Sequence, residues 1–185
     1  DTGTTIAFAG KEWYVISDGS TGAAVNSGHL TLLAKDSFGN STFRNYTSGS
    51  YEGSFADPSD YNDSTLMHAM ATATDALPTS EAALITARSL DGIGGTAVSG
   101  QKLWPLSLTE YNAMGTLSGD AFSNFFWLRS PLDVYCAYVG FPGGGTFNFI
   151  IVLDPFIAVR PALHLNLSSV LFTSDATAGS GKSSA

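Results

Sequence analysis

Helical periodicity in this chain is short, and that limits the available folds more than any other feature. One sustained stretch has the i, i+3, i+4 spacing of an amphipathic helix, through Leu66, Met67, Met70, Ala73 and Leu77. Asp63 or Ser64 can cap this helix, and Pro78 ends it. The rest of the chain has to be organised by shorter helices and by strands.

Two further short helices are predicted. One begins at Thr79 and carries Leu84 and Ile85. The other begins at Ser107, where a serine at the cap and Glu110 three residues later can satisfy two backbone donors reciprocally, as in a capping box.

Strands are predicted near both ends of the chain. The first two alternate apolar and polar residues about a turn at Gly10, with apolar positions Ile6, Phe8, Trp13 and Val15. Another strand spans His29–Ala34, and from Gly119 onward Phe, Ile, Val, Tyr and Gly dominate, with a turn at residues 142–145. We therefore predict an α+β domain.

The length of 185 residues fits one globular domain. We place this domain at residues 1–168 and a flexible C-terminal tail, rich in Thr, Ser, Ala and Gly, at residues 169–185. Polar residues in irregular order between Asp36 and Asp63 predict a long surface excursion.

The charge balance excludes some classes of partner. Eight Lys and Arg against 16 Asp and Glu give a net charge of −8 without a basic cluster, so no nucleic acid partner is expected. No apolar run reaches the roughly 20 residues of a membrane helix, so we expect no membrane insertion. The single cysteine, Cys136, excludes an internal disulfide, and residues 1–4 do not resemble a signal peptide.

Candidate catalytic motifs are weak. Asp1-Thr2-Gly3 matches the aspartic-protease triplet, but that chemistry needs a second carboxylate of the same kind, and no second triplet occurs. The three histidines, His29, His68 and His164, lack the paired spacing of zinc sites. We therefore predict no catalytic residue, no metal site and no cofactor.

Asp57, Asp60 and Asp63 stand three residues apart, and loops rich in carboxylates can hold calcium. The order of an EF-hand loop is absent, and Asp also caps helices and forms turns, so we favour capping over calcium. Asn-x-Ser/Thr triplets begin at Asn40, Asn45, Asn62 and Asn166; such triplets arise easily in a chain of this composition.

Two distinctive phrases stand on either side of one segment. The first runs from Trp127 to Pro131 (Trp-Leu-Arg-Ser-Pro), and the second from Val159 to Leu167 (Val-Arg-Pro-Ala-Leu-His-Leu-Asn-Leu). With these phrases, and with Trp13 and Tyr111 upstream, the chain resembles, from about Ile6 to Leu167, a prokaryotic and phage domain family of unknown function. Some members of that family look like variable proteins of diversity-generating retroelements.

The resemblance implies a C-type-lectin-like fold of the formylglycine-generating-enzyme type, with few short helices around small antiparallel sheets. It also implies that the segment between the phrases is diversified by adenine mutagenesis. Where related chains have asparagines, this one has Phe141, Phe147, Phe149, Ile150, Ile151, Leu153, Phe156 and Ile157. Randomised AAC or AAT codons never give Lys, Glu, Gln, Met or Trp, and none of these five types occurs from Leu132 to Ala158.

We therefore expect a non-enzymatic ligand-binding protein whose variable region is residues 132–157. The predicted ligand-binding residues are Leu132, Asp133, Val134, Tyr135, Cys136, Tyr138, Gly140, Phe141, Phe147, Asn148, Phe149, Ile150, Ile151, Leu153, Asp154, Phe156 and Ile157. Tyr135, Tyr138 and the phenylalanines are the expected anchors. The alternative is that Phe147 to Leu153 forms a buried core strand.

The expected partner is a protein or another macromolecular surface, and display on a virion or cell envelope, or secretion, from a prokaryote or phage is the matching setting. Two other functions stay open: a calcium-dependent glycan-binding lectin, and an oxidase related to formylglycine-generating enzymes. For the framework, the two phrases predict that Trp127, Leu128, Val159 and Leu163 are buried and that Arg129 and Arg160 are held by hydrogen bonds.

Overall fold

The computed structural model describes residues 3–52, 59–91, 97–117, 120, 122–141 and 146–169, and only the backbone at 147–149. The elements follow one another as β1 (Thr5–Phe8), β2 (Lys11–Ser17), β3 (His29–Ala34), β4 (Tyr46–Thr47), β5 (Ser50–Tyr51), α1 (Thr65–Asp75), α2 (Thr79–Ala82), β6 (Ile85–Thr86), β7 (Arg88–Asp91), β8 (Ala97–Gln101), α3 (Leu108–Met114), β9 (Phe126–Pro131), β10 (Cys136–Gly140), β11 (Thr146–Ile151) and β12 (Ala162–Asn166). The predicted α+β class, with few short helices and small antiparallel sheets, is confirmed.

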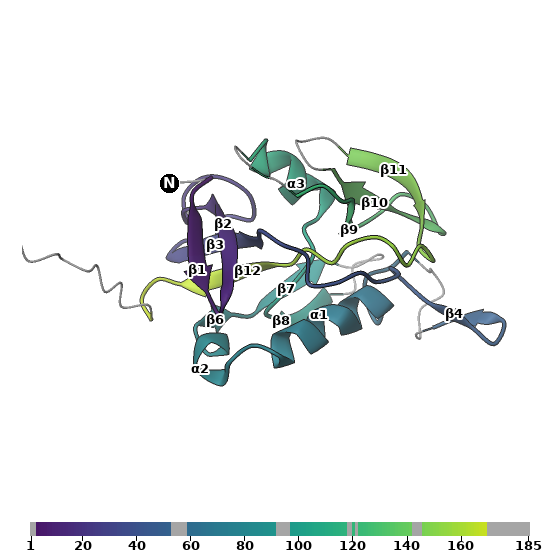
Figure 1. The fold of residues 1–185 in the computed structure, drawn as a ribbon, viewed down its shortest axis with the longest axis horizontal. Helices are drawn as coiled ribbons and strands as arrows, with labels where there is room; N and C mark the ends of the chain where they lie inside the picture. Colours follow the sequence, from purple (N-terminus) through teal and green to yellow (C-terminus); the bar gives the residue numbers. More distant parts are fainter. Residues whose placement is uncertain are drawn as a thin grey trace, which may run out of the picture.

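The larger sheet joins the two ends of the domain. Its strand order is β1-β2-β3-β12-β6, and all its pairings are antiparallel (Figure 1). β12 lies between β3 and β6, with Leu163 opposite Leu32 and Leu165 opposite Ile85. The second phrase of the sequence, from Val159 to Leu167, thus contains β12, which is paired on both sides within the larger sheet.

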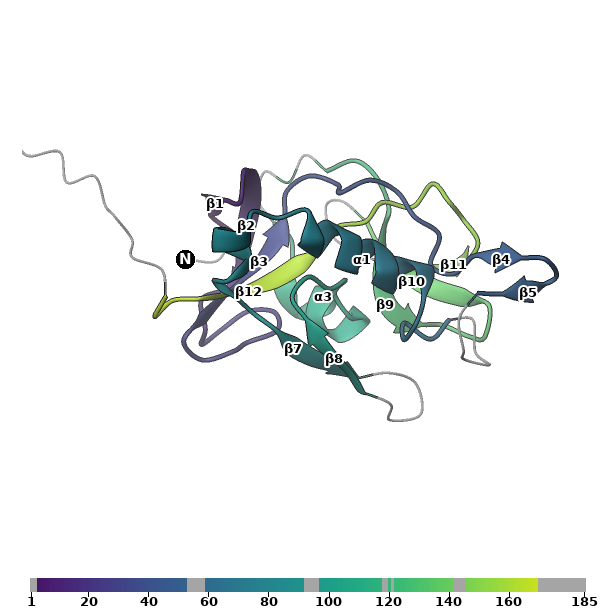
Figure 2. The same ribbon diagram turned by 90° about the horizontal axis from the view of Figure 1, so that it is seen from below.

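The smaller sheet carries the segment between the two phrases. Its order is β11-β10-β9, and β9 is tied to the framework where Trp127 N–H donates to the Ala158 carbonyl at 3.1 Å and Arg129 N–H to the Leu106 carbonyl at 2.9 Å. In Figure 1, α1 runs along the lower side of the molecule, and in Figure 2 the β4–β5 hairpin projects from the end of the molecule that also holds β10 and β11. No helix among the described residues is long and apolar enough to cross a membrane.

The core is built around three tryptophans. Trp13, Trp104 and Trp127 are fully buried, and Trp127 also donates its indole N–H to the Ser41 carbonyl at 2.7 Å. Leu128, Val159 and Leu163 are buried with them, so the predicted burial of both phrases is confirmed. Burying each large side chain contributes about 1.5 to 3 kcal/mol.

Both arginines of the phrases are paired, as predicted. Arg160 donates from Nε to the Ala34 carbonyl at 2.8 Å and forms a bidentate pair with Asp120 at 2.9 and 3.0 Å. Arg129 donates to the Pro105 carbonyl and forms a bidentate pair with Glu110. These charge-assisted bonds offset the cost of removing the guanidinium groups from water.

The helix caps are those that the sequence predicts, with one correction. Ser64 Oγ accepts from Met67 N–H at 3.0 Å, and Ser107 and Glu110 form the capping box of α3. The second helix ends at Ala82, and Ile85 lies in β6 instead of on that helix. Ile85 pairs with β12, because strand pairing at the sheet edge buries its side chain better than one more helical turn would.

The segment from Asp36 to Asp63 is not peripheral, contrary to the prediction. Phe43 and Arg44 are fully buried within it. The Arg44 guanidinium donates to the carbonyls of Glu52, Asp60, Asn62 and Asp63, and so gathers the loop around itself. A polar composition does not reveal a buried arginine that donates to four backbone carbonyls.

Several predicted features lie outside the described residues. They are Asp1 and Thr2 of the protease-like triplet, Asp57 of the acidic loop, the turn at 142–145, and the tail from residue 170 onward.

Candidate binding face

A tight turn between β9 and β10 presents the first exposed side chains. Asp133 Oδ1 accepts from the backbone N–H groups of Tyr135 at 2.8 Å and Cys136 at 2.9 Å, and Leu132 N–H donates to the Cys136 carbonyl at 2.9 Å. With its backbone bonds satisfied locally, the turn leaves Val134 and Tyr135 in solvent, Tyr135 being 55% exposed.

A second turn follows β11 and is built in the same way. Asp154 N–H donates to the Ile151 carbonyl at 3.0 Å, and Asp154 Oδ1 accepts from Phe156 N–H at 2.9 Å. The turn begins beside the first one, because Val152 N–H donates to the Tyr135 carbonyl at 3.0 Å. It exposes Ile151 and Phe156, and Phe156 is 80% accessible to solvent.

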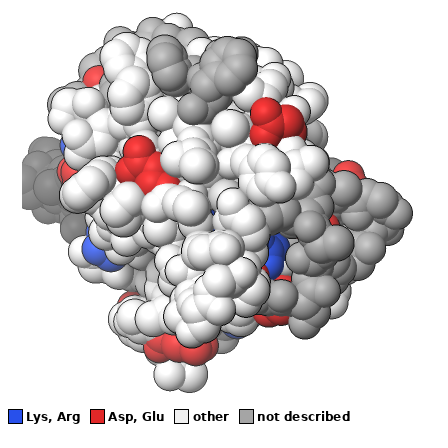
Figure 3. Space-filling model, turned by 90° about the vertical axis from the view of Figure 1, so that its right-hand side faces the viewer, with Lys and Arg blue, Asp and Glu red and all other residues white. Residues whose placement is uncertain are grey.

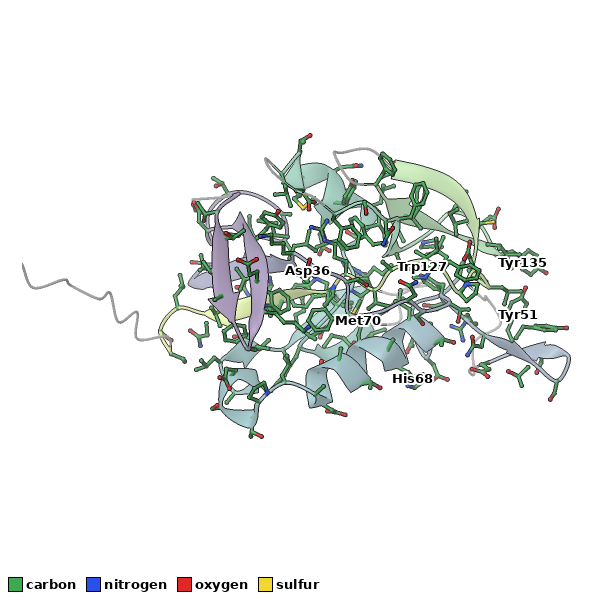
Figure 4. The ribbon with its side chains drawn as sticks, viewed as in Figure 1. Asp36, Tyr51, His68, Met70, Trp127 and Tyr135 are labelled. Atoms are coloured by element: carbon green, nitrogen blue, oxygen red, sulfur yellow. The ribbon has the colours of Figure 1, made fainter. Side chains whose placement is uncertain are left out.

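The β4–β5 hairpin adds two tyrosines from a distant part of the sequence. Ser48 and Gly49 have φ of 55° and 87°, as the tight two-residue turns of hairpins require. Tyr46 pairs with Tyr51, their ring centroids 5.0 Å apart, and the Tyr51 ring lies 6.0 Å from that of Tyr135. Figure 4 shows Tyr51 and Tyr135 next to each other at one end of the molecule.

The base of the hairpin is fixed to the same segment. Arg44 N–H donates to the Val152 carbonyl at 3.0 Å, and Asn45 N–H donates to Thr65 Oγ1 at the start of α1 at 2.8 Å. The hairpin and the two turns therefore form one surface, which we call the aromatic face and define by Tyr46, Tyr51, Val134, Tyr135, Ile151 and Phe156.

Apolar exposure is concentrated on this side of the described structure. Of the seven large hydrophobic residues that are exposed in the described structure, five lie between Leu132 and Ile157, and all of these five except Phe141 belong to the aromatic face. A sixth, Tyr46, reaches that segment through Tyr51. The segment from Ser130 to Val159 contains no Lys or Arg. Viewed from the hairpin end in Figure 3, most of the visible surface is uncharged.

The predicted site residues divide into three groups. The exposed members are Asp133, Val134, Tyr135, Phe141, Ile151 and Phe156. The half-buried members are Leu132, Cys136, Tyr138, Ile150, Leu153 and Asp154. Phe147, Asn148 and Phe149 lie in β11, and their side chains are outside the described residues. Phe141 contacts Phe125 at the opposite end of β10 from Tyr135, so it is separate from the aromatic face.

Two predicted site residues belong to the core instead. Gly140 is buried, and a Cβ at this position would come within 2.4 Å of the Phe126 ring, so the glycine makes room for that ring. Ile157 is only 4% exposed, and its carbonyl accepts from Ser41 N–H at 3.1 Å. Gly140 has no side chain to offer a ligand and the Ile157 side chain is enclosed in the core, so neither residue belongs to the aromatic face.

Side chains with reactive potential are held in structural roles. Partial burial and the neighbouring Asp133 raise the pKa of the Cys136 thiol, which keeps it protonated and weakly nucleophilic. His164 is buried between the Asn26 amide at 3.2 Å and the Ala24 carbonyl at 3.0 Å. Among the described residues, no three His, Cys, Asp or Glu side chains are grouped to hold a metal ion.

The tyrosines of the hairpin were missed by the sequence prediction. A usable signal was present: Tyr46-Thr47-Ser48-Gly49-Ser50-Tyr51 places two aromatic residues symmetrically about a Ser-Gly pair, which is typical of a hairpin with a tight turn.

Comparisons of the chain with protein-family models, with curated proteins and with solved structures found no match in any of the three. The functional proposal is therefore carried by the geometry and chemistry of the face.

Proposed function

We propose that this chain is a non-enzymatic binding domain and that its aromatic face holds a protein or another large surface. The observation that carries the proposal is the concentration of exposed apolar side chains on the turns between residues 132 and 157 and on the adjoining hairpin. Exposed apolar patches of this kind usually mark sites of interaction with a partner.

The chemistry of the face suits a macromolecular partner. Tyrosines bury a large area with only two side-chain torsions to fix, so they lose little entropy on binding. Each large side chain that leaves water at a contact can contribute about 1.5 to 3 kcal/mol. The hairpin and both turns are held by hydrogen bonds within the domain, which reduces the cost of ordering them.

We extend the proposal to a C-type-lectin-like fold and a variable protein of a diversity-generating retroelement. Two features support this. The two phrases that suggest the family contain most of β9 and all of β12, which is paired on both sides, and the segment between them carries most of the exposed apolar residues. Such a division between a fixed frame and a changeable surface is what targeted mutagenesis of one segment requires.

The test compares two variants. The first replaces Val134, Tyr135, Ile151 and Phe156 by serine, and the control replaces Val25, which is 51% exposed outside the face, by serine. Partners are captured with the wild-type domain from a bacterial surface extract, identified, purified and titrated against all three proteins. We expect the control to bind as the wild type does and the fourfold variant to lose at least a hundredfold in affinity, with its melting temperature nearly unchanged.

If the variant with four substitutions binds an identified partner as tightly as the wild type does, the proposed site is wrong. The extension to retroelements has its own test, which is a near-repeat of the coding segment for residues 132–157 beside a reverse transcriptase gene. Absence of both from the native locus contradicts that extension and leaves the binding face to the affinity measurement.

A further inference from the structure

A polar cleft of about 550 Å³ is lined by residues of β7, α3 and β9 and of the segment before α1, none of which belongs to the aromatic face. Its lining includes Asp60, Arg88, Asp91, Glu110, Arg129 and Ser130. Its volume is within the range of about 300 to 1,000 Å³ that small-molecule sites occupy.

Glu110 forms the floor of this cleft and has no capacity left for a ligand. Its carboxylate accepts from the Ser107 N–H at 2.8 Å, from Arg88 at 2.9 Å, and from both terminal nitrogens of Arg129. Burial alone would raise the pKa of Glu110, but the hydrogen bonds and positive charge of Arg129 outweigh burial and hold that pKa below its ordinary value. Glu110 is therefore an ionised framework group.

Two residues that line the cleft, Arg88 and Ser130, have hydrogen-bond donors to spare. Within the described part of the chain, Glu110 is the one hydrogen-bond acceptor of Arg88, whose guanidinium lies 4.9 Å above the Trp104 ring and has five N–H groups in all. Ser130 Oγ accepts from Leu108 N–H at 2.9 Å, which leaves the hydroxyl proton to donate. Together these two groups match a carboxylate.

Two other residues that line the cleft, Asp60 and Asp91, have hydrogen-bond acceptors to spare. Asp60 is 3% exposed, and in the described structure its carboxylate has one hydrogen bond, from Asn62 N–H to Oδ1 at 3.0 Å. Asp91, at the far end of β7 from Arg88, has no hydrogen bond or ion pair to another described residue. These carboxylates match an ammonium group. Arg88 and Asp91 are about 10 Å apart along the strand, a span that their side chains and a small ligand can bridge.

We propose that this cleft binds a small zwitterion of the α-amino-acid type, with its carboxylate on Arg88 and Ser130 and its ammonium group on Asp60 and Asp91. If these charged groups served only to stabilise the fold, the cleft would bind a zwitterion no better than a compound with a single charge. The site is independent of the aromatic face, so either proposal can fail without the other.

The experiment measures melting temperature and calorimetric binding of the whole chain with glycine, L-alanine, L-serine and L-glutamine. Acetate and methylammonium, at equal ionic strength, carry one charge each and serve as ligand controls. At ten times the dissociation constant, a bound amino acid should raise the melting temperature by about 3 °C or more. Each single-charge compound should bind at least tenfold more weakly than the best amino acid.

Two variants locate the site. Asp91→Asn removes an exposed carboxylate of the cleft and should weaken amino-acid binding at least tenfold while the domain stays folded. Asp75→Asn, at the exposed end of α1, is the matched control and should bind as the wild type does. If none of the four amino acids binds, if acetate or methylammonium binds equally well, or if Asp91→Asn has no effect, the proposal is overturned.

Discussion

The two phrases and the segment between them differ in which side chains they bury: the phrases bury charged side chains, and the segment exposes apolar ones. In the phrases, the charged side chain of Arg160 is buried and that of Arg129 is half-buried, and each forms a bidentate pair with a carboxylate. In the segment, Tyr135 and Phe156 are apolar and left in water. Burial therefore follows the position of a residue in the fold and not the polarity of its side chain, and the side chains that stabilise the frame differ from those of the proposed binding face.

The largest expected effect tests the frame. Arg160→Ala leaves Asp120 buried without its partner, so the free energy of unfolding should fall by about 3 to 5 kcal/mol, measured by urea unfolding. The control is Lys35→Ala, which breaks the exposed pair with Glu12 and should cost less than about 1 kcal/mol. Equal losses in the two variants would contradict the contrast between frame and surface.

A neighbouring pair of residues sharpens the contrast within the segment itself. Ile157→Ala should cost about 2 to 5 kcal/mol because the side chain is buried. Phe156→Ala should change stability by no more than about 0.5 kcal/mol because that side chain is in solvent. The free energies of unfolding of the two variants are compared by chemical denaturation. A large loss of stability in Phe156→Ala would place Phe156 in the core.

The frame should also respond to pH through His164. Burial, opposed by a hydrogen bond to the Ala24 carbonyl and assisted by the charge of Arg88, lowers the pKa of His164 to about 4. The unfolded chain then binds a proton that the folded chain does not, so stability is full above pH 6.5 and falls as the pH drops toward 4. The loss from this group approaches about 3 kcal/mol at pH 4.

The measurement is the free energy of unfolding at pH 7, 5.5 and 4.5 for the wild type and His164→Gln. The variant should have a lower stability at pH 7 and a shallower decline between pH 6.5 and 4. Parallel pH profiles would show that His164 is not responsible.

Among the changes to buried residues, the smallest expected loss is at Gly140. Gly140→Ala forces the Phe126 ring to shift, and overpacking of this kind costs about 1 to 3 kcal/mol. Partner binding, once stability is restored by lower temperature, should be unchanged. A loss of affinity in a fully folded variant would return Gly140 to the binding face.

The sequence was sufficient wherever structure is decided by near neighbours. Ser107 and Glu110 are three residues apart and cap one helix, and the alternation about Gly10 produces the β1–β2 hairpin. Burial of Arg44 could not be predicted, because the carbonyls to which it donates come from residues 8 to 19 positions further along the chain, in an irregular loop.

Periodicity also could not sort the residues of the candidate face. Ile151, Val152 and Ile157 are all β-branched and apolar, yet only Ile151 is exposed. The turn at Asp154 decides which of them face inward, and that turn depends on its contact with Tyr135. The charged cleft was missed for the same reason, since Arg88, Glu110 and Arg129 come from three separate elements.

The Arg44 side chain, which donates to four carbonyls of its own loop, affects how a group of such domains could come to bind different ligands. It holds the hairpin tyrosines from residues outside the changeable segment, so in the proposed variable protein Tyr46 and Tyr51 would be common to every version. For each new sequence of residues 132–157, Tyr46 and Tyr51 would already be ordered for binding, so the new residues would not have to supply all of the affinity. Ligand surfaces that accept tyrosine side chains would then be favoured. Weak binding to such surfaces would be common among new sequences, and selection could strengthen it.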